Sequence, residues 1–235
     1  MFCIAIADLV VELDNRYAHV EQLCRDYVTS SHAPAFRVRV TEDEIRAYRT
    51  SAGRPMTAPE AESYLLYRHI CEQMPAYDAF LLHAAVVEMD GRGYVFSAPR
   101  GTGKSTHTNL WKTHFPGRAT IINGDKPLVR RAADGRLWAY GTPWCGKEGH
   151  EENRKCPLTA ICFLEQAAEN RITPMSTSDT AARLLGATIL PREPALQDRM
   201  AALIGQVVRT TPAYCLSCRP DTAAAELAYE YLSQV

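Results

Sequence analysis

The chain has 235 residues, of which 46% are hydrophobic and 23% charged, so it is long enough to bury a substantial core. Its formal net charge is −1 and its pI is near 6.7, which argues against nucleic acid or an anionic membrane as a partner. The first residues lack the basic region and cleavage site of a signal peptide, and no apolar run approaches the ~20 residues of a membrane span. We therefore expect a cytoplasmic protein that binds neither nucleic acid nor membrane. Whether it forms a homo-oligomer stays open.

The N-terminal part predicts a small subdomain over residues 1–56. Short strand-like runs at 2–7 and 36–40 are joined by polar connections, which indicates an α+β unit without recognisable chemistry. A second domain then covers residues 57–235. It opens with a capping box, Thr57 to Glu60, followed by an apolar stripe at helical spacing that ends before Pro75.

The next elements predict a mixed sheet around a glycine-rich loop. Residues 80–87 read as a buried strand, and a turn leads to a second strand at 93–96 that enters the loop, so the loop follows a hairpin. A helix from Lys104 to about His114 and a strand at 119–122 come next. Further elements follow in the order strands 127–131, 137–140 and 158–164, helices 178–189 and 195–208, strand 213–218, and a closing helix capped by Asp221.

The eight cysteines lie mostly in apolar runs, which is typical of buried thiols in a reducing compartment. Cys215 and Cys218 form a C-x-x-C pair without a second pair or histidine partners. We interpret it as part of an alternating strand rather than as a metal site.

Residues 97–106, Ser-Ala-Pro-Arg-Gly-Thr-Gly-Lys-Ser-Thr, predict a site for nucleotide phosphates. Glycines let backbone N–H groups turn inward around an anion, Lys104 can reach the β- and γ-phosphates, and the Ser105 hydroxyl is placed to bind Mg²⁺. Ala98 stands where the usual pattern has glycine. The residues expected to bind the phosphates are Arg100, Gly101, Thr102, Gly103, Lys104, Ser105 and Thr106.

Two further side chains are candidates for catalysis beside this loop. Asp125 follows the strand after the loop, where an acid can bind Mg²⁺ or deprotonate an attacking hydroxyl; the alternative is an aspartate that opens a tight turn. His83 lies in an apolar run on the preceding strand, where it contacts phosphate or is a core histidine.

The polar segment 142–154 is the third candidate region. Lys147 could neutralise a transferring phosphate, Asn153 or Arg154 could hold substrate, and Trp144 could stack on a base. A solvated loop is the alternative for each of them.

The order of these motifs resembles the HPr serine kinase-like branch of the phosphoenolpyruvate carboxykinase-type P-loop fold. The resemblance rests on Leu82 to Ala85, on Gly101 to Thr106, on Ile122 to Pro127 and on Gly141 to Lys147, and it covers residues 77–165. It implies an α/β, mixed-sheet P-loop domain that uses ATP and Mg²⁺. By the same resemblance, Lys104 and Ser105 hold ATP phosphates and Mg²⁺, and His83 is the histidine near the reacting phosphate.

The resemblance favours a kinase that phosphorylates a serine-like hydroxyl on a small molecule, a peptide or a protein. HPr kinases proper carry two consecutive acids after the strand that corresponds to residues 119–122, whereas here Gly124 precedes Asp125. The missing acid favours an alternative, a regulatory protein that binds the nucleotide and hydrolyses it slowly or not at all. A carboxykinase fits less well because the second metal constellation is missing and the chain is short. We expect the acceptor between the glycine-rich loop and segment 142–154, with His83 and Lys147 converging on the γ-phosphate.

Overall fold

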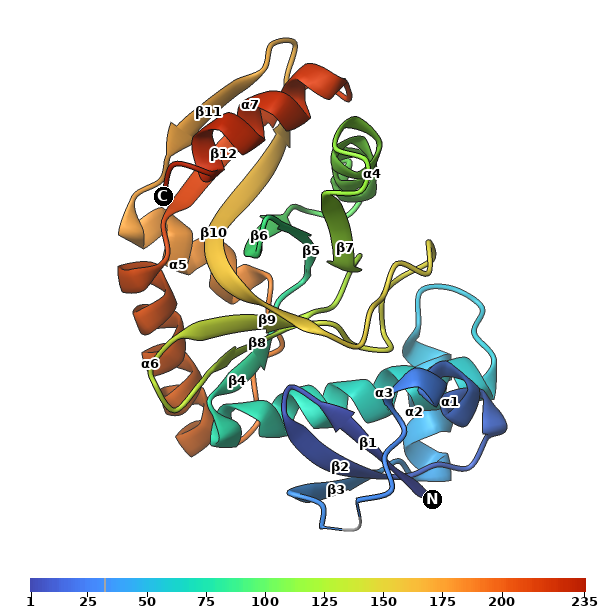
Figure 1. Cartoon of the computed structure of the whole chain (residues 1–235). Helices are drawn as coiled ribbons and strands as arrows, with labels where there is room; N and C mark the ends of the chain where they lie inside the picture. Colours follow the sequence, from blue (N-terminus) through green and yellow to red (C-terminus); the bar gives the residue numbers. More distant parts are fainter. Residues whose placement is uncertain (32) are drawn as a thin grey trace.

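The computed structural model describes residues 1–31 and 33–235 (Figure 1). Over these residues the chain forms a mixed α/β fold with one three-stranded and one nine-stranded sheet. None of the helices in this described part combines the length and apolar character needed to span a membrane.

The small sheet is built from the N-terminal segment. Strand β1 (Phe2–Ile6) pairs antiparallel with β2 (Leu9–Asp14), and β3 (Phe36–Arg39) pairs parallel with β2. The connections contain α1 (Ala18–Leu23), the 3₁₀ helix η1 (Arg25–Tyr27) and α2 (Glu42–Ser51). The sequence predicted β1 and β3, and it missed β2, α1 and α2.

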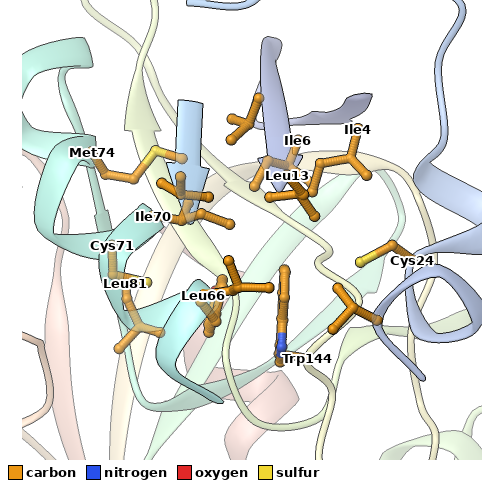
Figure 2. Packing of buried hydrophobic residues seen from close by; sticks show 14 of the residues in the cluster. Ile4, Ile6, Leu13, Cys24, Leu66, Ile70, Cys71, Met74, Leu81 and Trp144 are labelled. Atoms are coloured by element: carbon orange, nitrogen blue, oxygen red, sulfur yellow. The ribbon is translucent and has the colours of Figure 1, made fainter. Parts of the chain in front are cut away.

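Helix α3 (Ala58–Gln73) lies against this small sheet (Figure 1). It begins with the predicted capping box and passes into the 3₁₀ helix η2 (Met74–Tyr77). Its buried side chains join those of the small sheet in one apolar cluster, part of which is drawn in Figure 2. The division of the chain at residues 56 and 57 remains a prediction.

The large sheet has the strand order β4-β8-β9-β10-β6-β5-β7, and β12 adds to it beside β10 and β11. Strands β6 and β12 both pair parallel with β10, while β5 is antiparallel to β6 and to β7. The strands are β4 (Ala79–Leu81), β5 (Ala84–Met89), β6 (Arg92–Ser97), β7 (Ala119–Asn123), β8 (Leu128–Arg131), β9 (Leu137–Tyr140), β10 (Lys155–Gln166), β11 (Arg171–Pro174) and β12 (Ala213–Cys218).

Helices cover both faces of the large sheet. The side chains of successive strand residues alternate between the faces: Val86 and Val95 pack with helices α5 and α6, whereas Val87 and Phe96 pack with α4 and α7. In Figure 1, α6 and α4 accordingly lie on opposite sides of β10. The helices are α4 (Lys104–His114), α5 (Thr177–Gly186), α6 (Pro194–Thr210) and α7 (Thr222–Leu232).

The predicted strand 80–87 is in fact two strands with a break at Leu82 and His83. Strand β4 pairs with β8, whereas β5 pairs with β6 and β7. The run changes partners at the break, where the His83 N–H donates to the Ala187 carbonyl at 2.6 Å. His83 therefore lies directly before the first residue of β5 and is not part of a strand.

Trp144 belongs to the core, so the idea that it stacks on a base is wrong. Its ring stacks on Tyr67 of α3 with 4.1 Å between centroids, and its Nε1 donates to the carbonyl and the hydroxyl oxygen of Ser63. Figure 2 shows Trp144 beside Leu66 within the cluster. The side chain thus anchors segment 142–154 to α3.

We expect Trp144→Phe to lower the free energy of unfolding by about 1–3 kcal/mol, because the smaller ring loses packing and leaves Ser63 without its buried donor. Urea unfolding measures the change. Trp138→Phe is the matched control, since Trp138 is only partly buried and should cost less. Equal unfolding midpoints for the wild type and Trp144→Phe would contradict the contribution of the Trp144 side chain to the stability of the core.

Candidate functional site

The candidate site lies where several strands of the large sheet end together. Strands β6, β10 and β12 run parallel, and the start of β5 lies beside the end of β6, with Ala84 opposite Ser97. The end of β7 is the next neighbour, with Asn123 opposite Val86. Crevices at such carboxyl ends are where open α/β sheets bind their ligands.

The glycine-rich loop, residues 98–103, connects the end of β6 to the start of α4. Gly101 and Gly103 have positive φ angles of 84° and 113°, which a side chain would strain. Gly103 caps α4 without any side-chain hydrogen bond, so the first N–H groups of the helix face the loop. Ala98 tolerates its Cβ because the side chain packs in the apolar cluster with Phe96.

Lys104 opens α4 and contacts His83. The two atoms Lys104 Nζ and His83 Nε2 lie 3.1 Å apart. Burial lowers the pKa of Lys104, and the nearby Asp125 carboxylate opposes part of that effect. An ammonium group in such a place lacks a full counterion and favours an anion.

Asp125 contacts both His83 and Lys126. His83 Nε2 lies 3.1 Å from Asp125 Oδ1, and Lys126 Nζ donates to Asp125 Oδ2 at 2.6 Å. Burial alone would raise the pKa of Asp125, but the hydrogen bonds and charges of His83 and Lys126 hold it well below its usual value. The carboxyl group is therefore ionised at neutral pH.

The turn that carries Asp125 is fixed by Asn123. The Asn123 side-chain oxygen accepts from the backbone N–H groups of Asp125 and Lys126, and its amide donates to Thr142. Gly124 packs closely, because a Cβ there would lie 3.0 Å from the Cys145 carbonyl oxygen. A second acid at position 124 would thus push against segment 142–154.

Segment 142–154 runs beside β7 and α4. The Gly124 N–H donates to the His150 carbonyl, and the Glu152 N–H donates to the Ile122 carbonyl. His150 Nε2 lies 3.1 Å from the Asn109 amide oxygen on α4. A Cβ at Gly146 would lie 3.0 Å from that of Asp125, so the segment covers one side of the carboxylate.

The polar side chains of this segment take different places. Asn153 donates to the Asp26 carbonyl and Arg154 pairs with Glu88, so both have structural partners, and a contact of either with substrate remains a prediction. Lys147 is exposed, next to Gly146, and its approach to a phosphate remains a prediction.

A cavity of about 780 Å³ lies beside the glycine-rich loop, on the side of α5. His83, Arg100, Phe163 and Arg183 are among its lining residues. A second cavity of about 510 Å³ lies between the loop, α4 and the ends of β10 and β12. Segment 142–154 lines neither of these two cavities, and the expected place of the acceptor between this segment and the loop remains a prediction.

Comparison with known proteins then places the chain in a family. The model of the family described as "SynChlorMet cassette protein ScmC" matches residues 61–220, more than half of the chain. The chain belongs to the ScmC family. No curated protein matches it.

A solved structure similar to this ScmC-family chain is "Structure of the Hpr(Ser) kinase/phosphatase from Coxiella burnetii". It has 13% sequence identity and a TM-score of 0.31, over 55% of this chain and 88% of that one. At this TM-score the likeness says nothing about the activity of the ScmC-family chain, which has to be argued from the site.

Sequence reasoning on this ScmC-family chain missed three polar residues of the site. Lys126 pairs with Asp125, Asn123 fixes the turn, and Gln166 donates to the Thr102 carbonyl of the loop at 3.2 Å. Lys126 and Asn123 flank the predicted acid, and that proximity could have revealed them. Gln166 follows the predicted strand 158–164, which in the structure extends two residues further.

Proposed function

We propose that this protein binds ATP and Mg²⁺ at residues 99–106 and transfers the γ-phosphoryl group to a hydroxyl on a small molecule, a peptide or a protein. The observation that carries the proposal is the group formed by Lys104, His83 and Asp125 beside the glycine-rich loop. A lysine and an acid close to a glycine-rich loop whose N–H groups can face an anion are what phosphoryl transfer requires.

The contacts of His83 Nε2 support an anion in this place. One imidazole nitrogen either carries a proton or offers a lone pair, so it cannot both donate to Asp125 and accept from Lys104. A phosphate oxygen beside Lys104 would remove the conflict, because it accepts from the ammonium group while His83 donates to Asp125.

The residues present also fit the expected metal. No cluster of three or more His, Cys, Asp or Glu side chains suitable for a metal exists in residues 1–31 and 33–235. Mg²⁺ needs fewer protein ligands, since it usually keeps several waters and binds one or two carboxylates together with substrate phosphates. Ser105 and Asp125 would hold the ion, and the ion would neutralise charge on the phosphates. Asp125 would then give up part of its contact with Lys126 in order to bind the ion.

Each side chain has a distinct role in the proposed transfer. The N–H groups of the loop and the Lys104 ammonium group bind and orient the phosphates. Asp125 orients the acceptor hydroxyl and accepts its proton late in the reaction, since its low pKa makes it a weak base. His83 holds Asp125 in place, and Lys147 stays a candidate for charge neutralisation.

A regulatory nucleotide-binding protein is the second candidate. Both oxygens of Asp125 already have partners, and a side chain at Gly124 would press on the Cys145 carbonyl oxygen, which disfavours a second acid there. Such a protein would bind ATP without transferring phosphate.

An assay with γ-labelled ATP, Mg²⁺ and a panel of hydroxyl acceptors, including serine peptides, separates the two candidates. We expect the kinase to label at least one class of acceptor above the rate of hydrolysis. ATP binding without transfer or hydrolysis across the whole panel would favour the regulatory protein.

A further inference from the structure

Two cavities adjoin the glycine-rich loop on different sides. The first, of about 780 Å³, is lined by His83 and by Gly186 of α5; the second, of about 510 Å³, is lined by Thr106 and Ala167. Gly101 and Thr102 line both, so each cavity touches the loop that would hold the phosphates. Both volumes fall in the range of small-molecule sites.

The two ends of a bound nucleotide can be told apart by their neighbours. The γ-phosphate must lie near Asp125, and His83, which contacts Asp125, lines the first cavity. Thr106 follows the proposed Mg²⁺ ligand Ser105 along α4 and lines the second cavity. The nucleoside is attached to the α-phosphate, at the opposite end of the phosphate chain from the γ-phosphate. It therefore lies on the side of the loop that is away from Asp125.

We propose that the second cavity holds the ribose and base of the nucleotide, and that the first cavity receives the hydroxyl acceptor. This inference rests on the proposed function and assigns its two substrates to separate sites. The nucleoside would thus contact α4 and the ends of β10 and β12.

The walls of the second cavity suit a heterocyclic base. Leu110, Leu164 and Pro220 supply apolar surface for the faces of the ring. Arg219 adds a planar guanidinium group at the exposed edge, held by Asp221 with Nη2 to Oδ2 at 2.8 Å. A guanidinium group oriented in this way can stack on a base.

His107 also lines this cavity, and its ring holds a buried polar atom without a partner. The residue is 3% exposed, and Trp111 Nε1 donates to His107 Nε2 at 3.0 Å. Burial lowers the pKa of His107 to about 4, so the ring is neutral and carries its proton on Nδ1. Nδ1 is buried and has no hydrogen-bond partner within residues 1–31 and 33–235, and an acceptor atom of a base would supply one if the ring turns toward the cavity.

Calorimetry with two ligands, Mg-ATP and Mg-tripolyphosphate, tests the assignment. Tripolyphosphate carries the phosphates without a nucleoside. We expect Ala167→Trp to weaken Mg-ATP at least tenfold and to leave Mg-tripolyphosphate within about twofold, because the indole fills only the second cavity. Ala168→Trp is the matched control, since Ala168 lines neither cavity; both alanines are exposed, so the fold should tolerate both changes.

Gly186→Trp is the reciprocal variant and fills the first cavity. A Cβ at Gly186 meets nothing within 4 Å, so a side chain can begin there without a clash. It should leave the binding of both ligands unchanged and lower transfer to the acceptor. In the wild-type protein, light-activated 8-azido-ATP should label Ala167 or residues 218–220, which line only the second of the two cavities, and this result needs no variant to fold.

Three results would overturn the assignment. Weaker Mg-ATP binding in Gly186→Trp but not in Ala167→Trp, or labelling within residues 183–187, would place the nucleoside in the first cavity. Equal wild-type affinity for ATP and tripolyphosphate would mean that no nucleoside site exists, while the phosphate site would stand. Binding of neither ligand would instead refute the proposed function itself.

Discussion

Lys104→Ala should weaken the binding of Mg-ATP by about thirtyfold or more. The Lys104 ammonium group is half-buried beside the glycine-rich loop, and its side chain contacts His83 rather than a carboxylate. A charge-assisted hydrogen bond to phosphate contributes about 2 kcal/mol, which corresponds to this factor. Isothermal titration calorimetry of the purified protein measures the change.

Lys112→Ala is the matched control for this variant. Lys112 lies on the same helix, is exposed and occupies its last turn, so removing it changes the net charge equally without touching the loop. We expect its affinity for Mg-ATP to equal that of the wild type. If Lys104→Ala also binds Mg-ATP with the affinity of the wild type, Lys104 does not contact the phosphates.

Asp125→Asn should lower the rate of phosphoryl transfer by about 10²- to 10³-fold while nucleotide affinity changes by a small factor. The low pKa of Asp125 makes it a full negative charge at neutral pH, and asparagine keeps the shape but loses that charge. A group that acts on the acceptor hydroxyl contributes mainly in the transition state, so the rate falls more than the affinity. Single-turnover transfer and calorimetry measure the two quantities separately.

Asp134→Asn is the control for the acid. Asp134 lies in the turn between β8 and β9, where it pairs with Arg136 at 2.6 Å, far along the chain from the loop. Its replacement should leave transfer unchanged. A transfer rate near that of the wild type in Asp125→Asn would mean that Asp125 has only a structural role, in the turn that Asn123 fixes.

The sequence predicted local features of the fold well. Helix α4 begins at Lys104 and ends at His114, as its position after a glycine-rich loop indicated, and β12 occupies residues 213–218 as the alternation of its residues suggested. Both predictions depend on signals carried by neighbouring residues. Helix α2 had such a signal as well, the capping box of Thr41 and Glu44, and it was overlooked.

The features that sequence reasoning missed depend on contacts between distant residues. The run 80–87 has no glycine or proline at its break, because the break arises where β4 and β5 pair with different strands. Trp144 reads as a loop residue until Tyr67 and Ser63, about 80 positions earlier, are seen to enclose it. The pairing of Lys126 with Asp125 likewise depends on which way a turn directs two adjacent side chains.

A crystal structure with Mg²⁺ and a non-hydrolysable ATP analogue tests the central claim most directly. We predict the phosphates within hydrogen-bonding distance of the N–H groups of residues 101–105 and of Lys104 Nζ, with the γ-phosphate toward His83 and Asp125. An analogue bound elsewhere, with the glycine-rich loop empty at saturating concentration, would contradict it.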